Sequence, residues 1–156
     1  MKFRLLAAGT RMPDWVDAGF ADYAGRMPRE CRLELREIPL GPRGGGRSDG
    51  RAVAVEGERM HKALSPSDRA VALDVGGKAL DTEALARRLA GWLQDGRDVI
   101  FAVGGPDGLA PSVVERAEWR WSLSPLTLPH GLVRVVLAEQ LYRAWTVLQG
   151  HPYHRA

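Results

Sequence analysis

The run Val99–Val103 constrains the fold more than any other part of the chain, because all five of its side chains are apolar. A strand without a polar face must be covered on both sides, as in parallel sheets flanked by helices. Two further strand-like stretches, 3–6 and 70–75, are separated from it by segments whose apolar residues recur at helical spacing. This alternation predicts an α/β fold, with a mostly parallel sheet and helices on both faces.

The other elements are predicted from apolar periodicity and from helix-breaking residues. Strands are expected over 33–38 and 121–123, and helices over 14–26, 53–64, 81–93, 111–117 and 132–149. The last helix should end at Gly150 and bury an apolar face made of Leu132, Val135, Val136, Leu141, Ala144, Trp145 and Leu148. Gly76-Gly77-Lys78 is predicted to be a turn that ends strand 70–75, and the glycine-rich stretch 41–51 to be a mobile loop.

Length and composition indicate one domain over residues 1–156, in the cytoplasm. No apolar run is long enough to cross a bilayer, and a lone Cys31 provides neither a disulfide framework nor a thiolate cluster. His130, His151 and His154 lack the spacing of metal ligands, so no metal is expected. Only 3 of the 22 basic residues are lysines. Arginine suits phosphate recognition, but GC-rich coding would produce the same bias, and both explanations stay open.

Three loops follow the carboxyl ends of predicted strands, where open α/β sheets bind ligands: 74–78, 104–109 and 123–130. Glycines at 104 and 105 would let a ligand approach backbone amides, although an isolated Gly-Gly-Pro-Asp-Gly is more often a simple turn. Leucines lie between two prolines in the third loop, where they either surround a flat ring or pack beneath the final helix. The GxGxxG and GxxxxGKS patterns are absent, which argues against dinucleotide and P-loop sites.

The tail His151-Pro152-Tyr153-His154-Arg155 is aromatic and basic. Tyr153 and His154 offer faces for stacking on an unpaired base, while Arg143 and Arg155 offer planar forks for phosphate. A frayed terminus is the alternative. If the tail meets the two loops that follow residues 103 and 122, the three form one composite site for a small cofactor and an anionic polymer.

Several segments together are specific to one family: Ala8–Val16, Gly104–Gly108, Leu123–His130, Arg134–Val135, Glu139–Trp145 and His151–Arg155. In these segments the chain resembles the ribosomal RNA large-subunit methyltransferase H family of the SPOUT superfamily. The resemblance spans essentially the whole chain. It departs from the family at Gly131, where the family has proline, and in the glycines at 44–46.

The resemblance implies a SPOUT domain with a C-terminal trefoil knot, a homodimer, and S-adenosylmethionine as cofactor. The implied activity is methylation of N3 of pseudouridine 1915 in 23S ribosomal RNA, whether as free RNA, large subunit or assembled ribosome. The implied cofactor contacts are Leu73, Gly104, Gly105, Leu123, Ser124, Pro125, Leu126, Thr127 and Leu128.

The tail supplies the implied catalytic residues. His154 is the candidate general base, Arg143 and Arg155 would favour the deprotonated ring, and Tyr153 would stack on or orient the base. The residue that takes the proton is left open. In a dimer, the tail of one subunit could complete the pocket of the other.

Two other classes of function remain as alternatives. The chain could be a non-catalytic RNA-binding or ribosome-associated factor, or a metabolic enzyme that uses another nucleotide. Arg43, Arg47 and Arg51 in the glycine-rich stretch either touch RNA phosphates or belong to a solvated loop.

Overall fold

The structure, a computed structural model, describes residues 1–43 and 50–155. The described strands form one sheet in the order β2-β1-β4-β3-β5, and every neighbouring pair is parallel. Their bounds are β1 (Lys2–Ala8), β2 (Arg32–Ile38), β3 (Arg69–Ala79), β4 (Val99–Val103) and β5 (Trp119–Ser122). The prediction of a parallel α/β sheet is therefore confirmed.

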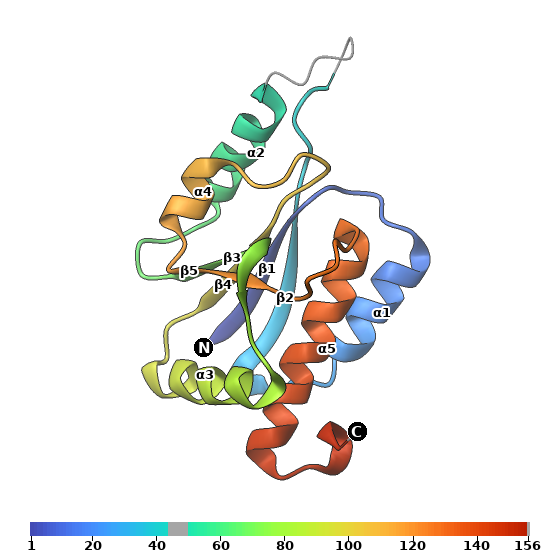
Figure 1. The fold of residues 1–156 in the computed structure, drawn as a ribbon, viewed down its shortest axis with the longest axis vertical. Helices are drawn as coiled ribbons and strands as arrows, with labels where there is room; N and C mark the ends of the chain where they lie inside the picture. The colour runs from blue at the N-terminus through green and yellow to red at the C-terminus, as the bar shows by residue number, and fades with distance from the viewer. Residues whose placement is uncertain (44–49, 156) are drawn as a thin grey trace.

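Helices cover both faces of this sheet (Figure 1). One face carries α1 (Asp14–Ala24), α3 (Thr82–Asp95) and α5 (His130–Gln149), with α5 packed against both of the others. The other face carries α2 (Arg51–Lys62) and α4 (Pro111–Arg116). Single turns of 3-10 helix precede β2 (η1, Arg29–Cys31) and follow α5 (η2, Pro152–His154).

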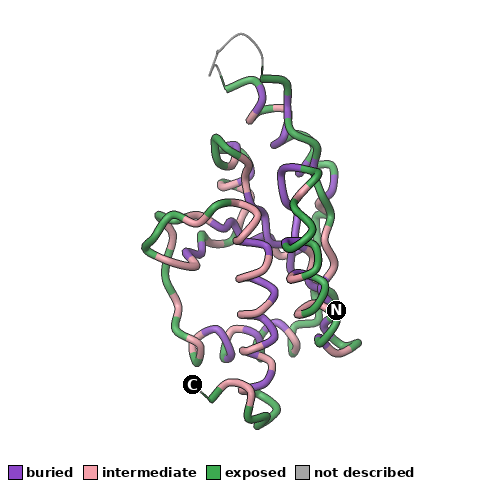
Figure 2. The backbone as a smooth tube through the Cα atoms, turned by 90° about the vertical axis from the view of Figure 1, so that its right-hand side faces the viewer, coloured by how far each residue is buried: buried purple, intermediate pink, exposed green. Residues whose placement is uncertain are grey.

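Alternation along the strands divides the core into two clusters. Phe3 and Leu5 of β1 join the cluster beneath α1, α3 and α5, whereas Leu6 and Ala8 join the one beneath α2 and α4. All five residues of β4 are buried, as an all-apolar central strand requires. The buried segments accordingly run through the middle of the molecule (Figure 2).

The predicted helix ends are set by local chemistry. The Asp81 carboxylate accepts a 2.8 Å hydrogen bond from the Ala84 amide and caps α3, and Gly96 ends that helix with a left-handed φ of 80°. Gly150, with φ 68°, ends α5 in the same way.

The predicted turn at Gly76-Gly77-Lys78 is wrong, because β3 continues to Ala79. The register against β5 shifts between Leu73 and Lys78, both of which pair with Trp121. The intervening residues therefore leave the ladder and return to it. Gly77 permits the return, since a Cβ there would lie 2.7 Å from the backbone of Arg120.

The predicted buried face of α5 is largely wrong. Leu141 and Ala144 are buried, but Leu148 is 37% exposed, and Leu132, Val135, Val136 and Trp145 are only partly buried. Because α5 packs on the sheet between α1 and α3, a different stripe faces inward: Val133, Arg134, Leu137, Ala138, Leu141, Tyr142, Ala144 and Thr146. A charged residue within this stripe is what apolar periodicity cannot anticipate.

The predicted mobile loop over 41–51 falls mainly on residues 44–49, which lie outside the described residues, as does Arg47. Arg51 begins α2 rather than belonging to a loop. The trefoil knot stays a prediction. Within the described ranges, no helix combines the length and hydropathy that crossing a membrane requires.

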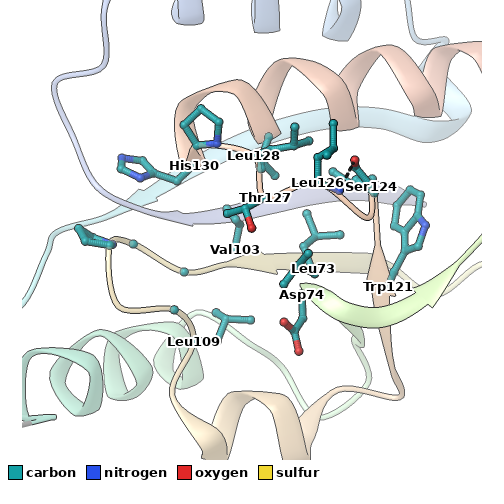
Figure 3. Close-up of a pocket in the computed structure, with 18 of the residues that line it drawn as sticks. Leu73, Asp74, Val103, Leu109, Trp121, Ser124, Leu126, Thr127, Leu128 and His130 are labelled. Carbon is teal, nitrogen blue, oxygen red and sulfur yellow. Dashed lines mark hydrogen bonds between the residues drawn. The ribbon is translucent and has the colours of Figure 1, made fainter.

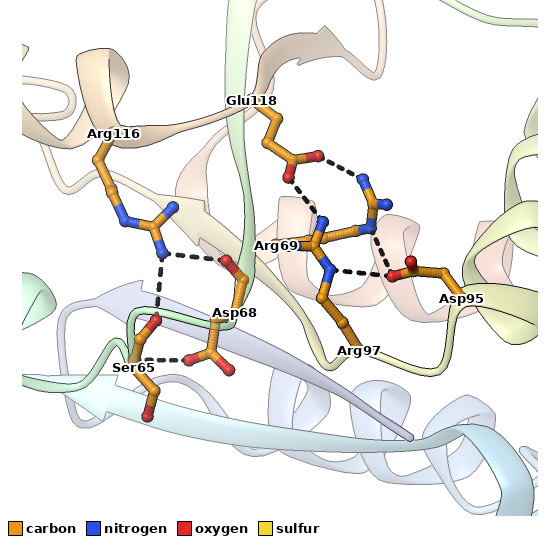
Figure 4. A network of polar contacts seen from close by, with 7 residues as sticks. All are labelled: Ser65, Asp68, Arg69, Asp95, Arg97, Arg116 and Glu118. Atoms are coloured by element: carbon orange, nitrogen blue, oxygen red, sulfur yellow. Dashed lines mark hydrogen bonds and ion pairs between the residues drawn. The ribbon is translucent and has the colours of Figure 1, made fainter.

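Four charged side chains form a closed ring at the amino ends of β3, β4 and β5 (Figure 4). Asp95 accepts hydrogen bonds from Nε of Arg69 and Nε of Arg97, at 3.1 and 3.0 Å. Glu118 accepts from the same two arginines at 2.7 and 3.1 Å. The ring thus joins the end of α3 to the starts of three strands, at the sheet edge opposite the loops 104–109 and 123–130.

The ring predicts a pH-dependent contribution to stability. Hydrogen bonds from Arg69 and then Arg97 hold the pKa of Asp95 below its usual range. A depressed carboxyl pKa stabilises the fold above the unfolded-state pKa of about 3.9, and this contribution disappears as pH falls through the lower folded-state pKa. Asp95→Asn should therefore lower the melting temperature at pH 7, and the difference from wild type should shrink below about pH 4. Glu115→Gln, on an exposed position of α4, is the control in calorimetry. A deficit that persists undiminished in acid would contradict the prediction.

Candidate functional site

The carboxyl ends of β3, β4 and β5 surround a cavity of about 590 Å³ (Figure 3). Two of the three loops singled out in the sequence, 104–109 and 123–130, meet there. The third, 74–78, belongs to β3, and of its residues Asp74 and Val75 line the cavity. All of the residues named as cofactor contacts line the cavity except Pro125: Leu73, Gly104, Gly105, Leu123, Ser124, Leu126, Thr127 and Leu128. Parallel topology explains the meeting, because it places these strand ends at one edge of the sheet.

Further residues complete the walls and were not identified as contacts from the sequence. Of the described residues that line the cavity, one is acidic, Asp74. Its Oδ2 accepts a 3.1 Å hydrogen bond from Arg120. Trp121 forms part of the wall from β5, and His130 and Val133 form part of it from α5. The position of Asp74 directly after an apolar run was an available signal, whereas Trp121 and Val133 look like ordinary core residues.

The glycine loop, residues 104–108, closes on itself more tightly than side chains would allow. A Cβ on Gly104 would lie 2.3 Å from the carbonyl carbon of Gly108, and Gly108 itself has a left-handed φ of 82°. The Gly108 amide donates a 3.1 Å hydrogen bond to the Gly105 carbonyl across the turn. The turn interpretation and the ligand interpretation are therefore compatible, because this turn presents backbone to the cavity.

The leucines of the prolyl loop, residues 123–129, are divided between the core and the cavity. Leu123 and Leu128 pack against the core cluster. Leu126 lines the cavity yet is 74% exposed. The Ser124 hydroxyl accepts a 2.9 Å hydrogen bond from the Leu126 amide, which holds the loop in shape without regular structure.

A buried arginine fixes the α5 wall of the cavity. Arg134 is 0% exposed, and its Nη1 donates a 2.8 Å hydrogen bond to Glu37 at the end of β2. Its Nη2 donates at 2.9 Å to the carbonyl of Gly9, which follows β1. His130 lies one helical turn earlier on α5, so this contact sets where that side chain meets the cavity.

The predicted catalytic residues of the tail form a separate cluster. The Tyr153 ring lies 4.7 Å from that of Tyr142, and the Arg143 guanidinium lies 5.1 Å from the Tyr153 ring. Arg143 also donates a 2.7 Å hydrogen bond to Glu139. Burial first, then a hydrogen bond with Tyr23 and the charge of Glu139, raise the pKa of Tyr153 to about 12.

The other two predicted catalytic residues are placed differently. His154 is partly buried, and its Nδ1 is shielded from solvent without a hydrogen-bond partner. Arg155 is exposed. The structure thus gathers Arg143, Tyr153 and His154 at one end of α5, with Arg155 in solvent beside them.

Within one chain the tail and the loops do not meet, and the expectation that the tail of one subunit completes the pocket of the other stays a prediction. His130 begins α5 at the cavity, and the tail follows the opposite end of that 20-residue helix. At 1.5 Å per residue, the two ends are about 30 Å apart. Figure 1 shows the C-terminus at the far end of α5 from the prolyl loop.

The family described as "Predicted SPOUT methyltransferase" matches residues 1–154. The chain belongs to the SPOUT methyltransferases. Two relatives, both named ribosomal RNA large subunit methyltransferase H, come from Alkalilimnicola ehrlichii and Pseudomonas putida strain W619. The first SPOUT relative is 62% identical over 156 residues, all of both chains. The second is 56% identical over 155 residues, 99% of this chain and all of the relative. The family resemblance seen in the sequence is confirmed.

A solved structure shares the SPOUT chain's fold. The crystal structure of a probable methyltransferase from Bordetella pertussis Tohama I superimposes with a TM-score of 0.58 at 19% identity. It covers 91% of this chain and 95% of its own. Across the described part of the SPOUT chain, no group of three or more histidine, cysteine, aspartate or glutamate side chains is placed to hold a metal ion.

The Arg134 contact predicts a specific loss of stability. Glu37→Gln leaves the buried guanidinium of Arg134 without its carboxylate. The free energy of unfolding should fall by about 1–3 kcal/mol, and not more, because Glu37 itself is about one-third exposed. Glu34 lies on β2 like Glu37, and Glu34→Gln removes its exposed ion pair with Lys2 of β1. This change should cost less than about 0.5 kcal/mol. Urea unfolding of both variants measures the difference. Equal stabilities for the two variants would show that Arg134 does not depend on Glu37.

Proposed function

We propose that this chain is an S-adenosylmethionine-dependent methyltransferase that methylates N3 of pseudouridine 1915 in 23S ribosomal RNA. The observation that carries the proposal is the cavity built by β3 and the loops after β4 and β5 in a SPOUT chain. Full-length relatives named ribosomal RNA large subunit methyltransferase H support the RNA substrate. An enzyme acting on the large ribosomal subunit works in the cytoplasm.

The lining of the cavity fits the proposed donor. Backbone of the glycine loop faces the cavity at Gly104 and Gly105, where polar ring or ribose edges can be recognised. Leu126 and Leu128 supply apolar surface for a flat ring, and Asp74 supplies a negative charge suited to a cationic ligand. When bound, the donor supplies a methyl group activated by a sulfonium. The residues of the cavity hold and orient it, which is the main demand of an in-line transfer.

The acceptor nitrogen carries a proton that must leave before it can attack. His154 is the proposed general base, and Arg143 and Arg155 stabilise the negative charge left on the ring. With its pKa near 12, Tyr153 is a neutral phenol at physiological pH, so it orients or stacks rather than taking the proton. Glu139 accepts hydrogen bonds from both Arg143 and Tyr153 and holds them together.

A homodimer reconciles the tail with the cavity. Because α5 separates the two by about 30 Å in one chain, the tail of a second copy has to supply the acceptor side of the site. The symmetric dimer would then contain two composite sites, each with a donor cavity from one subunit and a tail from the other.

A non-catalytic RNA-binding or ribosome-associated factor is the alternative. Transfer of labelled methyl groups to 23S ribosomal RNA from a strain lacking the modification tests the proposal directly. Free RNA, isolated large subunits and whole ribosomes should be assayed side by side, with mass spectrometry to locate the methyl group. Failure of all three substrates, or a methyl group elsewhere, contradicts the proposal.

Gly104→Ala should weaken donor binding by about tenfold or more, because its Cβ collides with the Gly108 backbone and a loss of about 1.4 kcal/mol suffices for that factor. The matched control is Gly91→Ala, in the middle of α3, where an added Cβ meets no atom within 4 Å. That change should raise stability by about 0.5–1 kcal/mol and leave binding unchanged. Titration calorimetry with S-adenosylmethionine measures both. Undiminished binding by Gly104→Ala would remove the glycine loop from the donor site.

His154→Ala should abolish methyl transfer while leaving donor binding nearly intact, because His154 is proposed to take the proton of the acceptor and does not line the donor cavity. Mixing this variant with Gly104→Ala, after dissociation and reassociation, should restore roughly a quarter of wild-type activity, since half the dimers are mixed and each contains one intact composite site. Each variant reassociated alone is the control. The assay is run with the donor well below the Kd of Gly104→Ala, where that variant alone has little activity. If the mixture is no more active than the average of its components, the site is not shared between subunits.

A further inference from the structure

The tip of the glycine loop is held from outside the cavity. Pro106 and Gly108 line the cavity, whereas Asp107 between them does not, and its side chain is 51% exposed. The Asp107 Oδ2 accepts a 3.0 Å hydrogen bond from Nε of Arg43. Arg43 lies in the segment after β2, 64 residues away in sequence. A distant segment thus contacts the residue of the loop that the donor cavity does not use.

The position of Arg43 is fixed by a buried carboxylate. Nη1 of Arg43 donates a 2.6 Å hydrogen bond to Oε2 of Glu56, a residue of α2 that is only 2% exposed. The same oxygen accepts a 2.8 Å hydrogen bond from the Gly41 amide. A carboxylate buried this deeply requires a counter-charge, so the guanidinium is held firmly on that side. Its Nε is left facing Asp107.

The base of the loop lies close to the same group. A Cβ on Gly105 would lie 3.8 Å from Oε1 of Glu56 and 2.9 Å from the side chain of Leu40. Oε1 of Glu56 is shielded from solvent and has no hydrogen-bond partner. The glycine loop therefore lies beside Glu56 at its base and is hydrogen-bonded to Arg43 at its tip.

We propose that Arg43 is a positioning residue for the methyl donor: buried Glu56 fixes its guanidinium, and the guanidinium fixes the tip of the loop whose backbone lines the donor cavity. The inference rests on the proposed function. Arg43 does not line the donor cavity and so acts through Asp107. Loss of the contact lets the loop tip move and weakens donor binding, while a donor that has bound is transferred as before.

The first test removes the tie without touching the cavity. Asp107→Asn should weaken the binding of S-adenosylmethionine by about two- to fivefold, the range expected of an exposed ion pair. Asp107→Glu keeps the carboxylate and should retain most of the affinity. The control, Glu34→Gln, removes an exposed ion pair at the far end of the sheet and should leave binding unchanged.

Salt provides a readout that a merely structural role would not move. The Arg43–Asp107 contact is exposed, so added salt screens it and should bring the wild-type affinity toward that of Asp107→Asn. The quantity to measure is the ratio of the donor Kd values of wild type and Asp107→Asn at each salt concentration, because salt also changes the binding of a charged donor to both proteins. In methyl transfer, Asp107→Asn should raise KM for the donor and leave kcat unchanged.

A double-mutant cycle identifies Arg43 as the partner. Arg43→Lys keeps a positive charge beside Glu56, but one ammonium cannot bridge two carboxylates as a guanidinium does. It should weaken donor binding as much as Asp107→Asn, and the double variant should be no weaker than either single variant.

The outcomes separate the inference from the function on which it rests. A wild-type protein that binds no donor overturns both. Wild-type binding with an unchanged Asp107→Asn variant, or additive losses in the cycle, overturns the positioning role alone. A fall in kcat at unchanged KM would likewise contradict it, because the loop would then act on the transfer step.

Discussion

The buried guanidinium of Arg134 is the contact on which the arrangement of the site depends. It joins α5 to the ends of β1 and β2 through Glu37 and the carbonyl of Gly9. A charge without solvent access is strongly destabilising when it loses its partners, so the helix has one favourable position on the sheet. That position places His130 and Val133 in the wall of the cavity.

Parallel topology and glycine residues both shape the cavity. Topology gathers the ends of β3, β4 and β5 at one edge, and glycines at 104 and 108 let one of the loops fold closely enough to present backbone. Ion pairs lie around this edge, from Arg43 with Asp107 to Arg120 with Asp74. The Arg43–Asp107 pair thus holds the glycine loop from outside the cavity, whereas Asp74 of the second pair also lines it.

Much of this was predictable from the sequence, for identifiable reasons. The all-apolar run of β4 and the alternating patterns around it indicated a parallel sheet. The strand-end rule located two loops that do meet and a third segment that belongs to β3 but also reaches the cavity. Periodicity failed where charge is buried: it assigned the wrong face to α5, since it has no means of placing Arg134 inside. It also mistook Gly76 and Gly77 for a turn, because the close approach of a neighbouring strand is a tertiary effect. The distance between tail and cavity could not be read from the order of motifs, because motifs close in sequence can lie at opposite ends of one helix.

The length of α5 has a geometric consequence. In a continuous helix, the number of residues sets how far apart the two ends lie and how they are rotated relative to each other. Each added residue would move the tail about 1.5 Å along the helix axis and rotate the tail by about 100° around that axis. Twenty residues therefore set how far and in which direction Tyr153 and His154 are presented to whatever lies beyond the helix end. Changing the residue count of this helix would redirect the tail.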